Sequence, residues 1–223
     1  MSPKPPLDLS GVKLLIIDLD NTLCDTFHSL SKHQWEKAIK ALRDDGVNPV
    51  LLDRLRKQLG KKSFRSSIGP LDERRKEIAI AAYDAVDVSK LRLYSDAQAI
   101  LDVPLRKVLV TRGETKLQRA KIRHLKLRRN FAKVYHVPTF KEKREAFSAI
   151  LKEFKVRPEE TLVIGDRIEE EIKDGNDLGM HTAFIDRPDW PCRLSVAKPD
   201  ISVKSLEHLV PHLRGKTNVR RAK

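Results

Sequence analysis

The chain has 223 residues, of which 34% are charged and 40% hydrophobic, and this balance indicates a globular protein with a substantial core rather than a disordered chain. No apolar run approaches the roughly 20 residues that span a bilayer, and the first residues lack the apolar stretch of a secretory signal. Two distant cysteines, Cys24 and Cys192, cannot form a disulfide framework. We therefore expect a cytoplasmic protein that does not enter membranes. The formal charge of +14 predicts attraction to anions without identifying the anion.

The first predicted strand is the apolar run 14–17, which ends at two carboxylates. Asp18 and Asp20 are separated by one residue, and the hydroxyl of Thr22 follows. Because residues i and i+2 of an extended chain lie on the same side, the two acids can converge. Two such charges favour a cation between them, and oxygen ligands favour a hard ion such as Mg²⁺. The alternative for this segment alone is that the acids only cap a turn.

From about Asp25 to Tyr94 the sequence predicts a helical insert. Residues 29–56 and 72–86 have helical composition, and Trp35, Ile39 and Leu42 mark one apolar face of the first of these ranges. Residues 60–70 contain the glycines and proline of a loop. We therefore expect two domains, an α/β core made of residues 1–24 and 95–223 and a small helical domain made of residues 25–94.

After the insert, short apolar runs alternate with helical segments. The predicted strands are residues 107–110, 133–137, 161–164 and 182–185, with a possible edge strand at 200–202. Strands separated by helix-length connections indicate a doubly wound, mostly parallel sheet. In such sheets ligands bind at the carboxyl ends of the strands, and Asp18, Thr111 and Asp166 each follow a strand. The pattern predicts one site that contains all three.

A strongly basic segment follows the second of these strands. Its cations are Lys116, Arg119, Lys121, Arg123, Lys126, Arg128 and Arg129. We favour a helix whose basic side chains stay in solvent while Leu117, Ala120 and Leu125 face inward. The alternative is a nucleic-acid patch, which is not favoured because no aromatic residue interleaves to stack on bases.

These motifs, in this order, resemble those of the haloacid dehalogenase (HAD) superfamily. Residues 18–23 resemble the first motif, and the strand that ends at Thr111 resembles the second. Lys143 stands where the lysine of the third motif is expected, and Lys141 is the less favoured alternative.

Residues 161–167 resemble the fourth motif, and Glu171 follows further along the chain. The resemblance extends from about Val12 to Leu213, apart from the insert. The position of the insert matches a cap domain of the type placed directly after the first motif.

The resemblance implies a Rossmann-like fold and a magnesium-dependent phosphatase acting on a small phosphate monoester. In that mechanism Asp18 attacks phosphorus and becomes an aspartyl phosphate, while Asp20 protonates the leaving oxygen and then activates water. The metal ligands would be Asp18, Asp20 through its backbone carbonyl, Asp166 and Glu171. The phosphate would be bound by Thr111, Arg112 and Lys143.

Three residues refine this interpretation. Asp20 argues against dehalogenases and phosphonate-cleaving relatives, which lack an acid at that position. Glu171 stands where an aspartate is common, and Arg112 stands where a small or amide residue is usual, so it faces either the substrate or the solvent. Two other hypotheses stay open because of the charge of +14: a phosphatase for nucleotide or nucleic-acid termini, and a basic binding protein without turnover.

Overall fold

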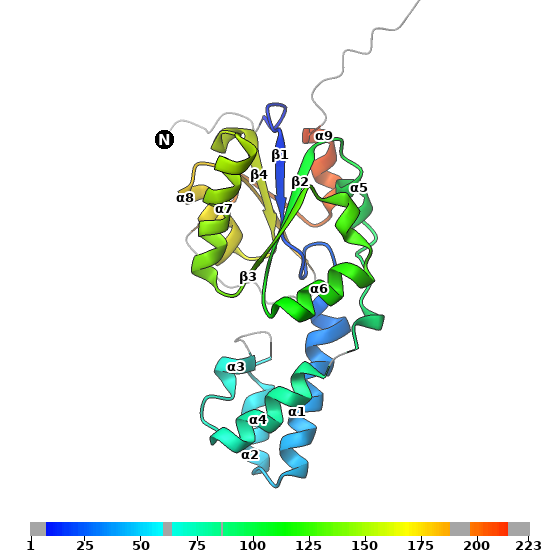
Figure 1. Cartoon of the computed structure of the whole chain (residues 1–223), viewed down its shortest axis with the longest axis vertical. Coiled ribbons are helices and arrows are strands. Elements are labelled where there is room, and N and C mark those ends of the chain that lie inside the picture. The colour runs from blue at the N-terminus through cyan, green and yellow to red at the C-terminus, as the bar shows by residue number, and fades with distance from the viewer. Residues whose placement is uncertain (1–7, 60–63, 86, 188–196, 214–223) are drawn as a thin grey trace, which may run out of the picture. The chain divides into compact units, whose positions relative to one another are not determined.

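The computed structural model describes residues 8–59, 64–85, 87–187 and 197–213, drawn as ribbons in Figure 1. The chain forms two compact units. We call the first the core unit, which consists of Met1–Cys24 and Leu93–Lys223, and the second the insert unit, which is Asp25–Arg92. Cys192 and the basic tail at 216–223 lie outside the described residues.

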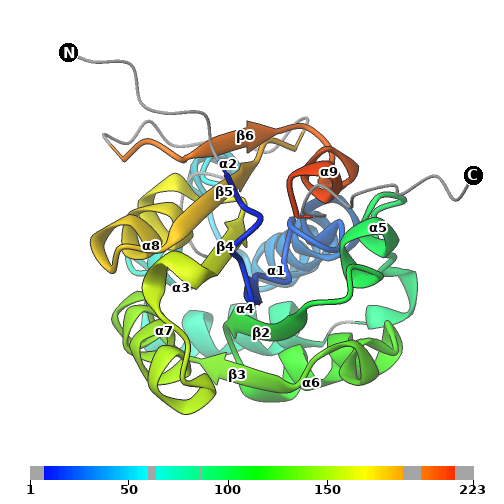
Figure 2. The ribbon, with the colours of Figure 1, turned by 90° about the horizontal axis from the view of Figure 1, so that it is seen from above.

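The core unit contains a six-stranded, all-parallel sheet with the order β3-β2-β1-β4-β5-β6. The strands are β1 Leu14–Ile17, β2 Arg106–Arg112, β3 Lys133–Val137, β4 Thr161–Gly165, β5 His181–Ile185 and β6 Ile201–Val203. Helices cover both faces, with α7 and α8 on one side and α5, α6 and α9 on the other (Figure 2). The predicted doubly wound α/β fold is therefore confirmed, including the edge strand near residue 200.

The register of the sheet brings three strand ends together. Ile17 lies opposite Leu109 of β2 and Ile164 of β4, so β1 runs between these two strands. Asp18 follows Ile17 directly, and its backbone N–H donates to the carbonyl of Ile164 at 3.0 Å. Thr111 and Asp166 each stand two residues beyond the β1 partners, at the same edge of the sheet, where parallel sheets bind their ligands.

Helices of the core unit are α5 Ala97–Leu101, α6 Thr115–His124, α7 Phe140–Phe154, α8 Lys173–Asp177 and α9 Val210–Leu213. Helix α7 begins with a capping box formed by Thr139 and Glu142. Phe147 and Ile150 of α7 pack into the core cluster on the sheet. Lys143 precedes Phe147 by four residues and therefore lies on the same inward face. Helix α7, the longest helix in the described ranges, has 15 residues, and none of the described helices could cross a bilayer.

The insert unit is helical, with α1 Lys32–Asp44, α2 Pro49–Arg56, α3 Phe64–Ser67 and α4 Glu73–Asp84. The helical range 29–56 expected from the sequence is broken into α1 and α2. Gly46, with φ of +77°, ends α1 in the left-handed conformation, and Pro49 opens α2.

Aromatic contacts hold the insert unit together. Residues 64–67, expected as part of a loop, form α3 because Phe64 stacks on Tyr83 at 4.1 Å and meets Trp35 edge-on at 5.1 Å between ring centroids. Trp35, Ile39 and Leu42 are buried, as the apolar pattern predicted.

Candidate active site at the carboxyl ends of the strands

Asp18 and Lys143 form a buried ion pair at the end of β1. Lys143 Nζ donates to Asp18 Oδ1 at 2.7 Å, and the two residues are only 2% and 6% exposed. Lys143 also donates to the carboxylate of Glu171. Lys141 is exposed and lies 3.9 Å from Glu145. The structure thus places Lys143 rather than Lys141 beside Asp18.

Carboxylates outnumber cations around this pair. Burial, followed by the charges of Glu171 and Asp20, raises the pKa of Asp18 to about 7 against the opposing effect of Lys143. Burial and the charges of Glu171 and Asp18 raise the pKa of Asp166 well above its usual value. Burial lowers the pKa of Lys143, but Asp18 and Glu171 outweigh it and the net change is upward. An added cation would favour the ionised form of these acids.

Asp166 has an oxygen that fits a hard cation. Its Oδ1 accepts a hydrogen bond from Thr22 at 3.4 Å, whereas its Oδ2 is buried without a hydrogen-bond partner among the described residues. A buried carboxylate oxygen in that state is costly unless a charge balances it. The described ranges contain no ready-made cluster of three or more His, Cys, Asp or Glu around a metal position. Mg²⁺ is usually bound by one or two carboxylates together with water and substrate oxygens, and Asp18 and Asp166 are the carboxylates that could hold it here.

Glu171 reaches Lys143 through space left open by a glycine. A side chain at Gly165 would overlap the Cβ and Cγ atoms of Glu171. The second Glu171 oxygen accepts from the backbone N–H of Arg167 at 3.1 Å, which fixes the carboxylate at the end of β4. The glutamate side chain, which is longer than the aspartate common at this position, is therefore closely packed and 1% exposed.

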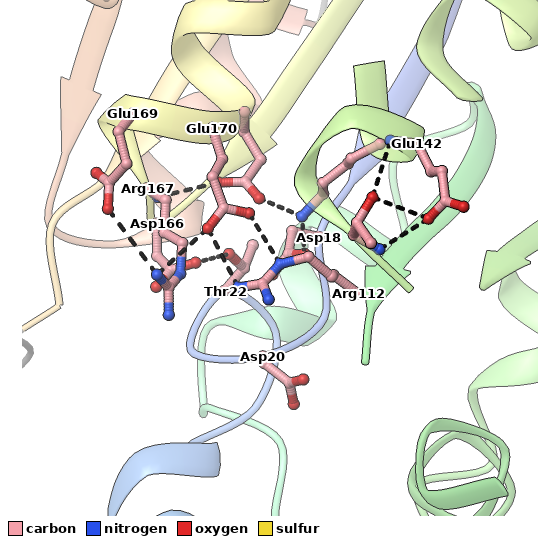
Figure 3. Close-up of polar contacts among 12 residues, drawn as sticks. Asp18, Asp20, Thr22, Arg112, Glu142, Asp166, Arg167, Glu169 and Glu170 are labelled. Carbon is pink, nitrogen blue, oxygen red and sulfur yellow. Dashed lines mark hydrogen bonds and ion pairs between the residues drawn. The ribbon is translucent and has the colours of Figure 1, made fainter. Parts of the chain in front are cut away.

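Asp20 lies apart from the Asp18 cluster (Figure 3) and is bound by α6. Lys121 Nζ lies 2.7 Å from Asp20 Oδ1 and Gln118 Nε2 lies 2.9 Å from Asp20 Oδ2. Lys121 and Gln118 are each 3% exposed, so the expectation that the whole basic segment stays in solvent is wrong for Lys121. A signal was available: Gln118, Lys121, Ile122 and Leu125 have the i, i+3, i+4, i+7 spacing of one inward helix face.

The turn between β2 and α6 makes these contacts possible. Gly113 has φ of +140°, and a side chain there would lie 2.8 Å from Gln118 Nε2. Only glycine adopts this conformation readily and leaves room for the amide. Gln118 Nε2 also donates to the carbonyl of Arg112 at 2.9 Å. Glu114 caps α6 by accepting from the backbone N–H groups of Lys116 and Leu117, so the helix start is fixed to the strand end.

Two arginines share one buried glutamate above Asp18. Arg112 donates to both oxygens of Glu170, each at 3.2 Å, and Arg167 lies 3.3 Å from the same carboxylate. Glu170 is 3% exposed, and burial followed by the charge of Glu171 raises its pKa. The sequence did not predict the contacts between these arginines and Glu170, because Arg112 and Glu170 are 58 positions apart in the chain.

Most of the predicted site residues line one pocket, and two do not. A pocket of about 70 Å³ is lined by Asp18, Asp20, Asn21, Arg112, Lys143, Arg167, Glu170 and Glu171. Thr111 and Asp166 are buried and do not line this pocket, and Thr111 Oγ1 has no hydrogen-bond partner in the described part of the chain. The structure therefore gathers all the predicted positions at one strand edge, with Asp20 on the α6 side of the pocket.

A second buried ion pair supports the loop that carries Asp20. Arg187 donates to both oxygens of Asp96 at 2.7 and 3.0 Å and to the carbonyl of Thr22 at 2.8 Å. Its guanidinium lies 3.9 Å from the centre of the Tyr94 ring, a cation–π contact. The backbone N–H of Leu206 donates to Asp96 at 2.9 Å. This cluster ties four segments of the core unit together, and no local pattern in the sequence predicted it.

Cys24, the other residue near the first motif, is a buried filler. It is fully buried and its thiol lies 3.5 Å from the carbonyl of Leu19. A buried cysteine of this kind packs like a small apolar side chain.

Comparisons with known proteins agree with the fold and the motifs. The family model for haloacid dehalogenase-like hydrolases matches residues 12–200. A glyceraldehyde 3-phosphate phosphatase from Methanocaldococcus jannaschii is 27% identical over 219 residues, which cover 89% of this chain and 96% of the relative.

Solved structures share the fold at lower identity. A predicted phosphoglycolate phosphatase from Haemophilus somnus superposes with a TM-score of 0.70 at 16% identity, covering 90% of this chain and 97% of the other. The HAD-hydrolase YfnB from Bacillus subtilis, solved with magnesium bound, gives a TM-score of 0.64 at 17% identity, covering 91% and 99%.

Proposed function

The chain belongs to the haloacid dehalogenase-like hydrolase family, and we propose that it is a magnesium-dependent phosphatase that hydrolyses a small phosphate monoester through an aspartyl-phosphate intermediate. The observation that carries this proposal is the buried Asp18, held by Lys143 at 2.7 Å beside the unpartnered oxygen of Asp166. This arrangement presents a nucleophile, a fixed positive charge and a cation ligand at one strand edge.

In the first step, an Asp18 oxygen forms a bond to phosphorus and the ester P–O bond breaks. One oxygen of Asp18 accepts from Lys143, so the carboxylate is oriented before substrate arrives. Bound Mg²⁺ would favour the ionised form of Asp18 and polarise the transferring group. Asp20 gives its proton to the leaving oxygen, which leaves as an alcohol.

In the second step, Asp20 takes a proton from water, the water oxygen bonds to phosphorus, and the acyl-phosphate bond to Asp18 breaks. A positioned acid–base group of this kind contributes typically about 10²–10⁴-fold. Lys121 and Gln118 determine where the Asp20 carboxylate rests between turnovers, so we assign them a positioning role.

The phosphoryl oxygens would be bound by Lys143 and by the guanidinium groups of Arg112 and Arg167. Guanidinium groups bind phosphate with two parallel N–H donors, so their orientation matters. Glu170 fixes both groups through its contacts at 3.2 and 3.3 Å. Thr111, whose hydroxyl lacks a partner among the described residues, is the further donor that the second motif suggests.

A phosphate ester is favoured over other substrates of this fold for two reasons. Asp20 supplies the proton that an alcohol leaving group needs, whereas a halide leaves without one. The Methanocaldococcus jannaschii relative is a glyceraldehyde 3-phosphate phosphatase. The pocket of about 70 Å³ receives the phosphoryl group, and we assign the choice of substrate to the insert unit, as the cap domain that the resemblance implies.

Phosphate release measured with a substrate panel tests the proposal. The panel contains glyceraldehyde 3-phosphate, sugar phosphates, nucleotides, 3′-phosphorylated oligonucleotides and p-nitrophenyl phosphate, each with Mg²⁺ and with chelator. We expect turnover of a small ester that needs Mg²⁺ and falls by on the order of 10⁴-fold in Asp18→Asn.

The controls separate the competing hypotheses. Activity confined to oligonucleotides would identify a nucleic-acid end phosphatase instead. A wild-type protein that is inert on every ester and binds RNA with a steep salt dependence would identify a binding protein.

A further inference from the structure

A groove lined by cations lies between helix α6 and strand β3 of the core unit. Its volume is about 490 Å³, and its lining residues are Arg119, Ile122, Arg123, Arg128, Lys133, Val134 and His136. None of them lines the pocket that contains Asp18. The proposed phosphatase chemistry therefore makes no use of this groove.

Two elements supply the cations and the apolar surface. Arg119 and Arg123 stand one turn apart on α6, with the buried Ile122 beside them. Val134 and His136 alternate along β3 and so face the same side of the sheet. Among the described strands, β3 lies at the edge of the sheet and pairs with β2 alone, so the groove lies at a margin of the sheet.

Most of the positive charge of the groove has no acidic partner among the described residues. Within the described ranges, Arg119, Arg123 and Arg128 have no carboxylate within ion-pair distance, and the lining contains no acid. Arg128 donates to the carbonyl of Phe131 at 2.8 Å, and Lys133 alone has an acidic partner, Glu153, at 2.6 Å. By contrast, Arg112 at the active site is paired with a glutamate.

This concentration of charge is unfavourable without a ligand. Like charges at i and i+4 on a helix destabilise it, and Arg119 and Arg123 have that spacing. Burial and then the charge of Arg119 lower the pKa of His136, whose Nδ1 is buried without a hydrogen-bond partner among the described residues. A bound anion would relieve both effects.

We propose that this groove binds a small polyanion that carries at least two phosphoryl or similar oxyanion groups. Guanidinium groups match such oxyanions with two donors each. The volume of about 490 Å³ lies in the range of about 300–1,000 Å³ for small-molecule sites. The lining contains no Phe, Tyr or Trp on which bases could stack, which favours a compact ligand over single-stranded nucleic acid.

Isothermal titration of the full-length protein with inorganic tripolyphosphate in metal-free buffer tests the proposal. We expect tripolyphosphate to bind more tightly than orthophosphate. The variant Arg119→Gln/Arg123→Gln should weaken tripolyphosphate binding by about tenfold or more, because charge-assisted hydrogen bonds are lost. The matched control is Lys116→Gln/Lys126→Gln, which removes the same charge from exposed positions outside the groove and should change the affinity less than about twofold.

Three outcomes would overturn the proposal: equal weakening in both double variants, equal affinity for tripolyphosphate and orthophosphate, or binding of a thymidine oligonucleotide in preference to tripolyphosphate. Thermal unfolding of both variants checks that they fold. If the arginine variant does not fold, the NMR signal of the His136 ring in the wild-type protein tests the proposal instead. Tripolyphosphate bound in the groove must shift this signal with the same concentration dependence as the calorimetric titration, and an unchanged signal would overturn the proposal.

Discussion

The core unit places its cations in two contrasting environments. At the strand ends, Lys143, Lys121 and Arg187 are buried and each contacts a carboxylate within 2.7 Å. On the outer side of α6, Arg119 and Arg123 line an open groove without an acidic partner in the described ranges. The same helix thus carries a cation that orients an internal acid and cations that remain available for an external anion. Burial and pairing, rather than residue type, separate the two roles.

Lys143→Met tests the buried environment where it matters most. We expect a loss of about 10³-fold in kcat, because the substitution removes the charge that orients Asp18 and binds phosphate. It also leaves two buried carboxylates without their cation, which should lower the free energy of unfolding by about 3–5 kcal/mol. Steady-state kinetics and urea unfolding measure the two effects.

Lys141→Met is the matched control, because Lys141 is exposed on the same helix, two residues away. Its kinetics and stability should match the wild-type protein. Equal losses in the two variants would contradict the assignment of Lys143.

Arg187→Met should be nearly as destabilising, by about 3–5 kcal/mol, because Asp96 would stay buried without its partner. Burial raises the pKa of Asp96, but its bonds to Arg187 and Leu206 outweigh this and hold it below the usual value. The stabilisation is therefore present above about pH 4, the usual Asp pKa, and fades as the pH falls through the lowered pKa.

Unfolding of Asp96→Asn across pH 2–8 measures this dependence. The difference from the wild-type protein should be largest near neutral pH and shrink in acid. A difference that grows in acid would contradict the ion pair as its source.

Lys121→Met should reduce kcat by about 10–100-fold for an alkyl phosphate and much less for p-nitrophenyl phosphate, whose leaving group needs no proton. A role through Asp20 predicts that the loss disappears in an Asp20→Asn background, since the two positions act as one unit. Arg119→Met, two residues away on the exposed face, is the control and should leave both rates unchanged. An equal loss on both substrates would indicate a general packing role for Lys121.

The smallest effect belongs to an exposed pair. Lys40 and Asp44 lie 2.7 Å apart on α1 and are 72% and 60% exposed. Asp44→Asn should change the free energy of unfolding by only about 0.3–0.5 kcal/mol. A change comparable to that of Arg187→Met would remove the distinction between buried and exposed pairs.

The strands and their terminal acids could be predicted because each is a local signal, an apolar run followed by a polar residue. Lys143 was predicted from its resemblance to the lysine of the third motif, and its position one helical turn before Phe147 agrees with that choice over Lys141. The break at Gly46 and Pro49 was visible in the sequence and given too little weight against the helical composition around it.

The contacts of Lys121, Glu170 and Arg187 were not predictable in the same way. Each joins residues at least 58 positions apart, and nothing local specifies such a pairing. Lys121 was further obscured by its basic neighbours, whose side chains point the opposite way on the same helix.

The close packing of Glu171 against Gly165 means that neither position tolerates a change of size. Shortening Glu171 to aspartate would remove one methylene and open a void beneath the glycine, while the carboxylate would retreat from Lys143. Enlarging Gly165 to alanine would instead expel the glutamate, because the added methyl group would occupy the volume that Glu171 fills. Aspartate keeps the Cβ and Cγ atoms that this methyl group would meet, so shortening Glu171 does not make room for alanine, and the double substitution should be at least as harmful as either single change.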